Sequence, residues 1–240
     1  YLLGNFQVID RTGTDITAEF SSILKQLLIL IILYTAKNGK GVSNTLLKEI
    51  FWYDKSEQSV RNNRNVNMRK LRKLLEGVGG FEITTDNSYW KMNYTREESV
   101  CDWAQAVMLL NEVQKETAEP ANILPKIVHI ASQGLLLPNS RYEWLDPFKA
   151  AYSDTVVTAL GKLREDTIFS ADFKIQLQLS DCILLFDSLD EESMRIKCLS
   201  LVALGRIGSA KNCFDAFLCE YRQVMGEEYP DSFEKFIQPA

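Results

Sequence analysis

The spacing of apolar residues changes several times along the chain, and each change predicts a new element. Residues 1–8 are strand-like, and the turn formers at 10–15 predict that the chain folds back there into a small antiparallel sheet. From Ser22 to Lys37 there is neither proline nor glycine, and apolar residues recur at helical spacing. Asn38-Gly39 then supplies a stop signal. We therefore predict a buried helix over residues 22–37.

Two more helices are predicted before residue 80. Ser43 is placed to cap a short helix that closes near Trp52. A third helix is predicted over about residues 58–76. Gly77-Val-Gly-Gly80 ends it, because glycine readily takes the left-handed conformation beyond a helix.

Strand-like residues return after these glycines. Phe81–Thr84 and Tyr89–Met92 flank the turn formers Thr85-Asp-Asn-Ser88, which predicts a hairpin. An N-terminal antiparallel sheet, three helices and a C-terminal hairpin together predict a winged-helix domain over residues 1–95.

Helical periodicity covers nearly all of the chain after residue 95. The breaks between helices are short, as in antiparallel helix pairs that stack to bury a shared apolar face. We predict an all-α, tetratricopeptide-like helical-repeat domain over residues 96–240, so that the whole chain is mainly α with a small β portion. Its predicted helices are Val100–Lys115, Ile123–Gln133, Trp144–Asp166, Phe173–Asp187, Glu191–Leu204 and Ser209–Met225.

The net charge of −5 is unevenly distributed. Residues 1–95 hold 13 Lys and Arg against 9 Asp and Glu, a net of +4, and the remainder holds 14 against 23, a net of −9. A basic first half suits an anionic partner such as nucleic acid, whereas an acidic second half suits protein contacts.

The third predicted helix concentrates this positive charge, with no acidic residue between positions 61 and 73. On a helical wheel one face anchors the helix through Arg64, Met68, Leu71, Leu75 and Val78. The opposite face presents Asn62, Asn65, Val66, Arg69 and Lys73. A helix fits the major groove of DNA, where arginine can make two hydrogen bonds to guanine and asparagine two to adenine.

We predict that this helix binds double-stranded DNA. A basic run is often only a solvated helix face, but the last helix before a hairpin is the exposed reader of a helix-turn-helix. Flanking charges such as Arg61, Lys70 and Arg72 suit phosphates, and Lys91 of the hairpin is either another phosphate contact or an ordinary exposed lysine. The predicted DNA-binding residues are Arg61, Asn62, Arg64, Asn65, Arg69, Lys70, Arg72, Lys73 and Lys91.

Residues 1–94 resemble the winged-helix domain of OmpR-type response regulators and of the antibiotic regulatory proteins. Leu46-Leu-Lys-Glu-Ile-Phe-Trp52 and Asn65-Val-Asn-Met-Arg-Lys-Leu-Arg-Lys-Leu74 carry the resemblance, the second in the family's recognition helix. Thr84–Trp90 resembles the wing. It departs from the family at Ser88-Tyr-Trp, where Gly-Tyr-Arg usually stands, and at Asp86, which argues against insertion of the wing into the minor groove.

The rest of the chain resembles the bacterial transcriptional activator domain that follows the winged helix in antibiotic regulatory proteins. The resemblance implies transcriptional control, with the helical domain contacting RNA polymerase, an upstream sensor domain or a second protomer. Pairing of two copies on repeated half-sites is a hypothesis for how a winged helix gains specificity. The matching segments are Cys101–Ala104, Gly134–Pro138, Glu143–Pro147, Ser188–Ser193, Ala203–Ala210 and Glu227–Ser232.

Other chemistry has little support in the sequence. Five cysteines and the single histidine, His129, offer no metal-ligand spacing, so we expect no metal, no cofactor and a reducing, cytoplasmic compartment. We interpret His129 as a core residue, and Trp103, Trp144 and Phe148 as core rather than pocket aromatics. The chain begins with Tyr1 rather than methionine, so we expect a fragment of a longer protein, and Leu27–Tyr34 is too short to cross a membrane.

Three segments imitate other sites. Gly205–Lys211 lacks the spacing of a phosphate loop and fits a turn between repeat helices. The acidic runs 187–192 and 227–231 lack a base, a nucleophile or a pocket, and we interpret them as solvated loops. An enzyme is therefore disfavoured, and the alternative to a DNA-binding regulator is a protein-interaction module in a signalling protein whose winged helix does not bind DNA.

Overall fold

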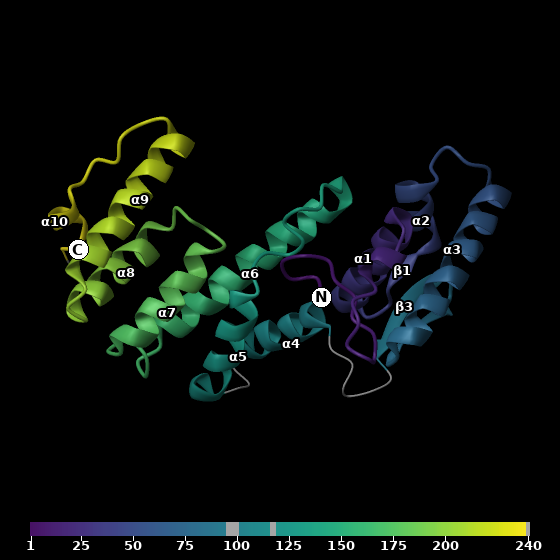
Figure 1. Ribbon diagram of the computed structural model, residues 1–240, viewed down its shortest axis with the longest axis horizontal. Helices are drawn as coiled ribbons and strands as arrows, with labels where there is room; N and C mark the ends of the chain where they lie inside the picture. The colour runs from purple at the N-terminus through teal and green to yellow at the C-terminus, as the bar shows by residue number, and fades with distance from the viewer. Residues whose placement is uncertain (95–100, 116–118, 239–240) are drawn as a thin grey trace. The chain divides into compact units, whose positions relative to one another are not determined.

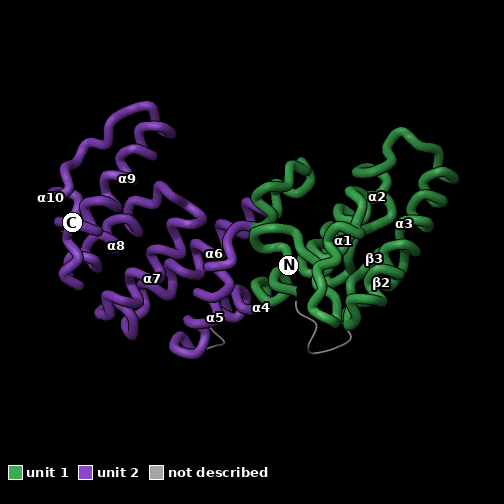
Figure 2. Tube along the Cα trace, in the orientation of Figure 1, with its two compact units in different colours: residues 1–107, 136–148 green, residues 108–135, 149–240 purple. Residues whose placement is uncertain are grey.

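The computed structural model describes residues 1–94, 101–115 and 119–238 of the chain, and it is mainly helical with one small antiparallel sheet (Figure 1). The fold class predicted from the sequence is confirmed. The chain divides into two compact units (Figure 2). Unit 1 contains residues 1–107 and 136–148, and unit 2 contains residues 108–135 and 149–240.

The centre of unit 1 is α1 (Ser22–Asn38), which is apolar on every side. Every residue from Leu27 to Leu33 is buried, so the helix is surrounded by other parts of the unit rather than facing solvent along one edge. It ends at Gly39, which takes a left-handed conformation as its sequence position predicts. Thr35 near its end accepts a hydrogen bond from the backbone N–H of Met92 at 3.0 Å, which ties α1 to the sheet.

The elements that follow α1 in unit 1 come in the predicted order, except that the two-residue strand between the first two helices was not predicted. They are β1 (Val42–Ser43), α2 (Asn44–Phe51), α3 (Glu57–Val78), β2 (Phe81–Asp86) and β3 (Tyr89–Tyr94). The Ser43 hydroxyl accepts a hydrogen bond from the backbone N–H of Leu46 and so caps α2 as predicted. The three strands lie in the order β1-β3-β2, and both pairings are antiparallel.

The predicted N-terminal sheet is not formed as regular strands. Residues 1–16 make only isolated bridges, Ile9 with Asp15 and Leu3 with Leu136. The turn at 10–15 is confirmed, because the Asp10 carboxylate accepts hydrogen bonds from the backbone N–H groups of Thr12 and Thr14. The physical reason for the missing strand lies at its start: the buried Asp102 carboxylate takes the N–H groups of residues 2 and 3, which a neighbouring strand would otherwise use.

Beyond residue 100 the described residues are helices and connecting turns. The principal helices are α4 (Asp102–Gln114), α5 (Pro120–Ser132), α6 (Asp146–Glu165), α7 (Phe173–Leu184), α8 (Glu191–Ala203) and α9 (Ile207–Met225). The predicted Trp144–Asp166 helix is divided, because a 3-10 turn over Glu143–Leu145 precedes α6 and Pro147 occupies the first turn of that helix. A short helix, α10 (Phe233–Phe236), was not predicted. The predicted domain boundary at 95/96 and Val100, the predicted start of the first helix after it, lie outside the described residues.

The helices of unit 2 pack in pairs, with α5 against α7, α7 against α8, and α8 against α9. The Gly205–Lys211 segment begins as the turn between α8 and α9, in agreement with its sequence interpretation. Gly205 there has φ +75°, and the fully buried Ala210 lets the two helices approach, with its carbonyl 3.6 Å from the Cys198 sulfur. Phe214 fills the core beside Phe217 and Phe236.

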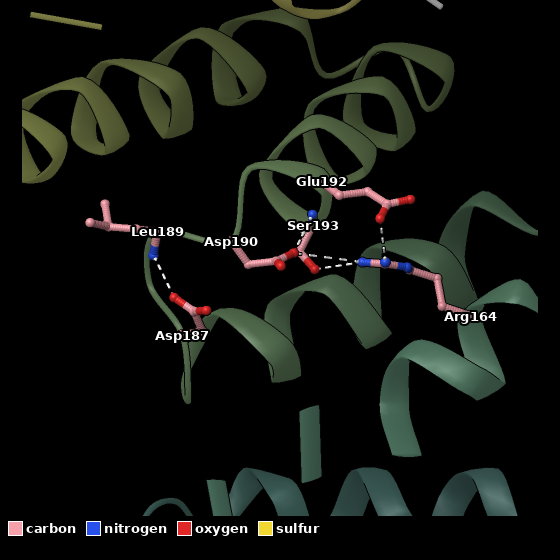
Figure 3. A network of polar contacts seen from close by, with 6 residues as sticks. All are labelled: Arg164, Asp187, Leu189, Asp190, Glu192 and Ser193. Atoms are coloured by element: carbon pink, nitrogen blue, oxygen red, sulfur yellow. Dashed lines mark hydrogen bonds and ion pairs between the residues drawn. The ribbon is translucent and has the colours of Figure 1, made fainter. Parts of the chain in front are cut away.

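Two residue-level interpretations are wrong. His129 is exposed on α5 rather than part of the core, and its ring lies 3.3 Å from the amide of Gln133. The acidic run 187–192 is not simply a solvated loop. Two of its carboxylates, those of Asp190 and Glu192, form ion pairs with the guanidinium of Arg164, whose side chain is only 7% exposed (Figure 3). None of the described helices is long and apolar enough to span a membrane.

Candidate nucleic-acid interface

The surface of α3 is divided into two faces, as its sequence predicts. Val60, Met68, Leu71 and Leu75 are buried against the rest of unit 1. This apolar stripe fixes the rotation of the helix, so the opposite face must lie toward solvent. The residues exposed there include Arg61, Asn62, Asn65, Val66, Arg69, Lys70 and Lys73. The structure thus places these predicted residues together on one accessible surface, which we call the outer face of α3.

The electrostatics of the outer face are uniformly positive. Within the helix, acidic residues occur only at its two ends, Glu57 in the first turn and Glu76 near the last. Glu57 forms an ion pair with Lys48 of α2. The basic residues of α3 between Glu57 and Glu76 therefore have no acidic partner within their own helix. A surface of this kind concentrates positive potential where a polyanion can approach.

Arg64 differs from the outer-face residues, because it is half-buried against the hairpin. Its guanidinium carbon lies 5.9 Å from the centroid of the Trp90 ring, within cation–π distance. Burial, followed by the nearby charge of Arg61, lowers the pKa of the Arg64 guanidinium, which nonetheless stays charged at any physiological pH. The helical wheel had placed Arg64 on the anchoring face, and the structure shows what it packs against.

Arg72 also contacts the hairpin. Its Nε donates a hydrogen bond to the carbonyl of Ile83 at 2.9 Å, and its guanidinium carbon lies 5.4 Å from the Trp90 ring centroid. One end of the guanidinium is therefore engaged within the protein. Two of the nine predicted site residues thus hold α3 and the hairpin together, whatever further contacts they make.

Trp90 is the residue of this region whose importance the sequence did not reveal. It lies on β3 with its ring buried, Arg64 and Arg72 of α3 lie over that ring, and its Nε1–H donates to the Asn44 side chain of α2 at 2.8 Å. One side chain thereby joins both helices of the helix-turn-helix to the hairpin. The sequence does contain a sign of this role, because Trp90 stands where the resembled family usually has arginine. From the sequence alone, that difference indicated only the loss of a basic residue.

The hairpin itself presents little positive charge. Its two-residue turn is made by Asn87 and Ser88, both with positive φ, at 45° and 70°. Asp86 is exposed beside them, and Lys91 is half-buried in the middle of β3, paired across the sheet with Thr84. The structure therefore brings Lys91 to the hairpin but not to its tip.

Comparison with known proteins adds one finding. No protein-family model matches the chain, and no curated protein sequence matches it. Among solved structures it is similar to Mycobacterium tuberculosis EmbR in complex with a low-affinity phosphopeptide, with a TM-score of 0.59 and 15% sequence identity. The fold is similar to that of EmbR. The match covers 98% of this chain and 62% of the EmbR chain, so the chain spans less than two thirds of EmbR.

At this level of identity the likeness to EmbR concerns the fold alone. It supports the arrangement predicted from the sequence, a winged helix followed by a helical domain. The candidate binding residues therefore rest on the geometry of α3 and not on the similarity to EmbR.

Proposed function

We propose that this chain is a sequence-specific DNA-binding module of a transcription regulator, and that α3 enters the major groove. The observation that carries the proposal is the outer face of α3, which is exposed, basic and rich in asparagine, and which follows the Ser43-capped α2 in a helix-turn-helix. A polar, positively charged helix face is what the major groove can admit and the phosphates attract.

The side chains divide into two roles. Asn62, Asn65, Arg69 and Lys73 face outward at helical spacing and are the proposed readers of base edges. Arg61 and Lys70 are the proposed phosphate contacts on either side of them. Arg64 and Arg72 hold α3 against Trp90, and Lys91 is a proposed phosphate contact from the hairpin.

We also propose that the module belongs with OmpR-type winged helices followed by a bacterial transcriptional activator domain. The sequence resemblance supports this, and the fold of EmbR is consistent with it. The boundary is proposed at residue 95/96, and the net charge of −9 beyond it favours protein partners there. RNA polymerase, an upstream sensor domain and a second protomer are the proposed partners, the last testable by sedimentation with and without DNA.

The test is selection from a random duplex pool followed by binding across a salt series. We expect an enriched motif, with affinity that falls steeply as salt rises. Arg69→Ala/Lys73→Ala, which removes two proposed base readers, should weaken binding by about 10-fold or more. Arg61→Ala/Lys70→Ala, which removes two proposed phosphate contacts, should lower the salt slope by about one for each charge removed. Lys174→Ala/Arg206→Ala, which removes the same charge from exposed positions in unit 2, should change neither.

The competing function is a protein-interaction module whose winged helix docks onto another protein. The unbroken positive charge of the outer face favours DNA over this alternative. Absence of binding to any duplex at low salt would contradict the proposal and leave the interaction module as the better explanation.

A further inference from the structure

One apolar side chain stands in the middle of the outer face of α3. Val66 is 47% exposed, and no other described residue of α3 is an exposed large apolar residue. Its neighbours one helical turn away in either direction are Asn62, Asn63, Arg69 and Lys70, all polar and all exposed. Val66 therefore has no apolar neighbour on that surface.

Folding gives no reason for a valine at this position. Its side chain adds little to the core, and a β-branched residue in a helix is less favourable than alanine, leucine, lysine or arginine. The surrounding surface is suited to hydrogen bonds and charge, which a valine cannot supply. A contact between the Val66 side chain and a molecule bound to the outer face of α3 would explain the valine.

The chemistry of the major groove offers an apolar contact of matching size. Thymine is distinguished there by its C5-methyl group, against which small apolar side chains pack, and the other bases present only donors and acceptors or a bare ring edge. Asparagine, a side chain that can pair with adenine, lies next to Val66 at Asn65 and one turn before it at Asn62.

We infer that Val66 is a specificity-determining residue that packs against a thymine methyl group in the DNA bound by α3. The inference rests on the proposed function and adds to it the identity of one base. Asn62 is partly preorganised on this surface, since its side-chain oxygen accepts a hydrogen bond from Gln58 at 3.2 Å. The selected motif should accordingly contain a thymine at the centre of the segment contacted by α3, flanked by bases that asparagine and arginine read.

The experiment replaces each thymine of the selected motif with uracil, one position at a time. Uracil lacks only the methyl group and keeps the same hydrogen-bonding atoms. For the unchanged chain, one central position should lose affinity about fourfold, the value of one buried methyl-sized group. With Val66→Ala, the thymine duplex should be bound about as weakly as the uracil duplex, and the uracil replacement should change affinity less than about twofold.

Val224→Ala is the matched control, because Val224 is 64% exposed on α9 and loses the same atoms. It should keep the full dependence on the thymine methyl. Val66→Ala itself places a better helix former at an exposed position, so loss of folding does not confuse the result. A motif whose uracil scan is flat, or a methyl dependence that survives Val66→Ala, overturns the assignment of Val66 while leaving DNA binding in place. A chain that selects no motif overturns the proposed function, and the assignment with it.

Discussion

At the scale of single residues, the winged helix depends on how closely its strands approach one another. Gly41 precedes β1 with φ +89°, and a Cβ added there would lie 2.0 Å from the Trp90 carbonyl oxygen on β3. Gly39, two residues earlier, also has positive φ, at +69°, but a Cβ there would meet nothing within 4 Å. Substitution of Gly39 by alanine therefore tests backbone strain alone, whereas substitution of Gly41 adds a steric clash with β3.

We predict that Gly39→Ala lowers the free energy of unfolding by about 1 kcal/mol, the cost of a left-handed alanine. Gly41→Ala should cost at least about 2 kcal/mol more, because β1 must also move away from β3. Urea unfolding followed by tryptophan fluorescence measures both, since Trp90 lies at this approach of the two strands. Equal effects of the two substitutions would show that the β1–β3 approach is not as close as described.

The sequence predicts correctly whether a residue is buried or exposed where the face of a single helix determines it. Helical spacing alone separates Met68 and Leu71 from Asn62 and Arg69, because a wheel needs no knowledge of the rest of the fold. It cannot identify the partners of Arg64 and Arg72, because Trp90 comes from another element 26 and 18 residues later in the sequence. His129 was misjudged for a related reason: apolar neighbours in sequence lie on a different face of the helix.

At the scale of elements, the junction of α6 with α8 is held by a buried charge. Arg164 donates to the Ser193 hydroxyl at 2.5 Å and lies 3.2 Å from a Glu192 oxygen and 3.9 Å from an Asp190 oxygen (Figure 3). Asp190 has a second role, because its carboxylate accepts the backbone N–H of Ser193 and caps α8. One carboxylate thus both starts a helix and neutralises an arginine from another.

Substitutions at Asp190 should separate these two roles. Asparagine caps helices as well as aspartate, so Asp190→Asn should lose only the charge and cost about 1 kcal/mol. Asp190→Ala should lose the cap as well and cost about 2 kcal/mol. Asp187→Ala, which removes only a 3.2 Å hydrogen bond to the N–H of Leu189, is the control and should cost less than about 0.5 kcal/mol.

Denaturation followed by circular dichroism measures these differences, because unit 2 is largely helical. Equal losses for Asp190→Asn and Asp190→Ala would mean that the cap contributes nothing and that the charge alone matters. An effect of Asp187→Ala as large as that of Asp190→Ala would instead favour a general role of the acidic loop.

Elements with strong local signals were predicted well. Ser43, Gly39 and the glycines after α3 mark helix ends through their own conformational preferences, which sequence displays directly. The N-terminal sheet was not predicted correctly, because its strand partner is replaced by a side chain about 100 residues away. The aromatic cluster that holds α10 against α9 likewise depends on tertiary contacts around Phe236, which no local pattern indicates.

At the scale of the whole molecule, the winged helix is completed by residues that sequence assigned to the following domain. The Asp102 carboxylate is 1% exposed and accepts hydrogen bonds from the backbone N–H groups of Leu2 and Leu3, at 2.8–2.9 Å. Leu137 donates its N–H to the carbonyl of residue 2 at 3.0 Å. All of these residues belong to unit 1, although Leu2 and Asp102 stand 100 positions apart in the sequence. No change of composition and no linker marks the residues after 100 that pack with the N-terminus, so the sequence could not show that they belong to unit 1.

Asp102→Ala tests whether this connection stabilises unit 1 on its own. Three buried N–H groups, those of Leu2, Leu3 and Trp103, would lose this acceptor, and we expect the free energy of unfolding of unit 1 to fall by about 2–4 kcal/mol. Asp102→Asn keeps one acceptor oxygen and should cost less. Tryptophan fluorescence reports on unit 1 alone, because all four tryptophans, Trp52, Trp90, Trp103 and Trp144, lie in it.

Alkylation of Cys198 reports on unit 2 in the same samples. Burial, followed by the neighbouring Cys213, raises the pKa of the Cys198 thiol to about 12, so the folded unit reacts slowly and unfolding exposes a reactive group. We expect Asp102→Ala to shift the fluorescence midpoint to lower urea while leaving the midpoint of Cys198 labelling unchanged. If both midpoints shift together, the two units unfold as one cooperative body, and a ligand that stabilises unit 1 would then stabilise unit 2 by linkage.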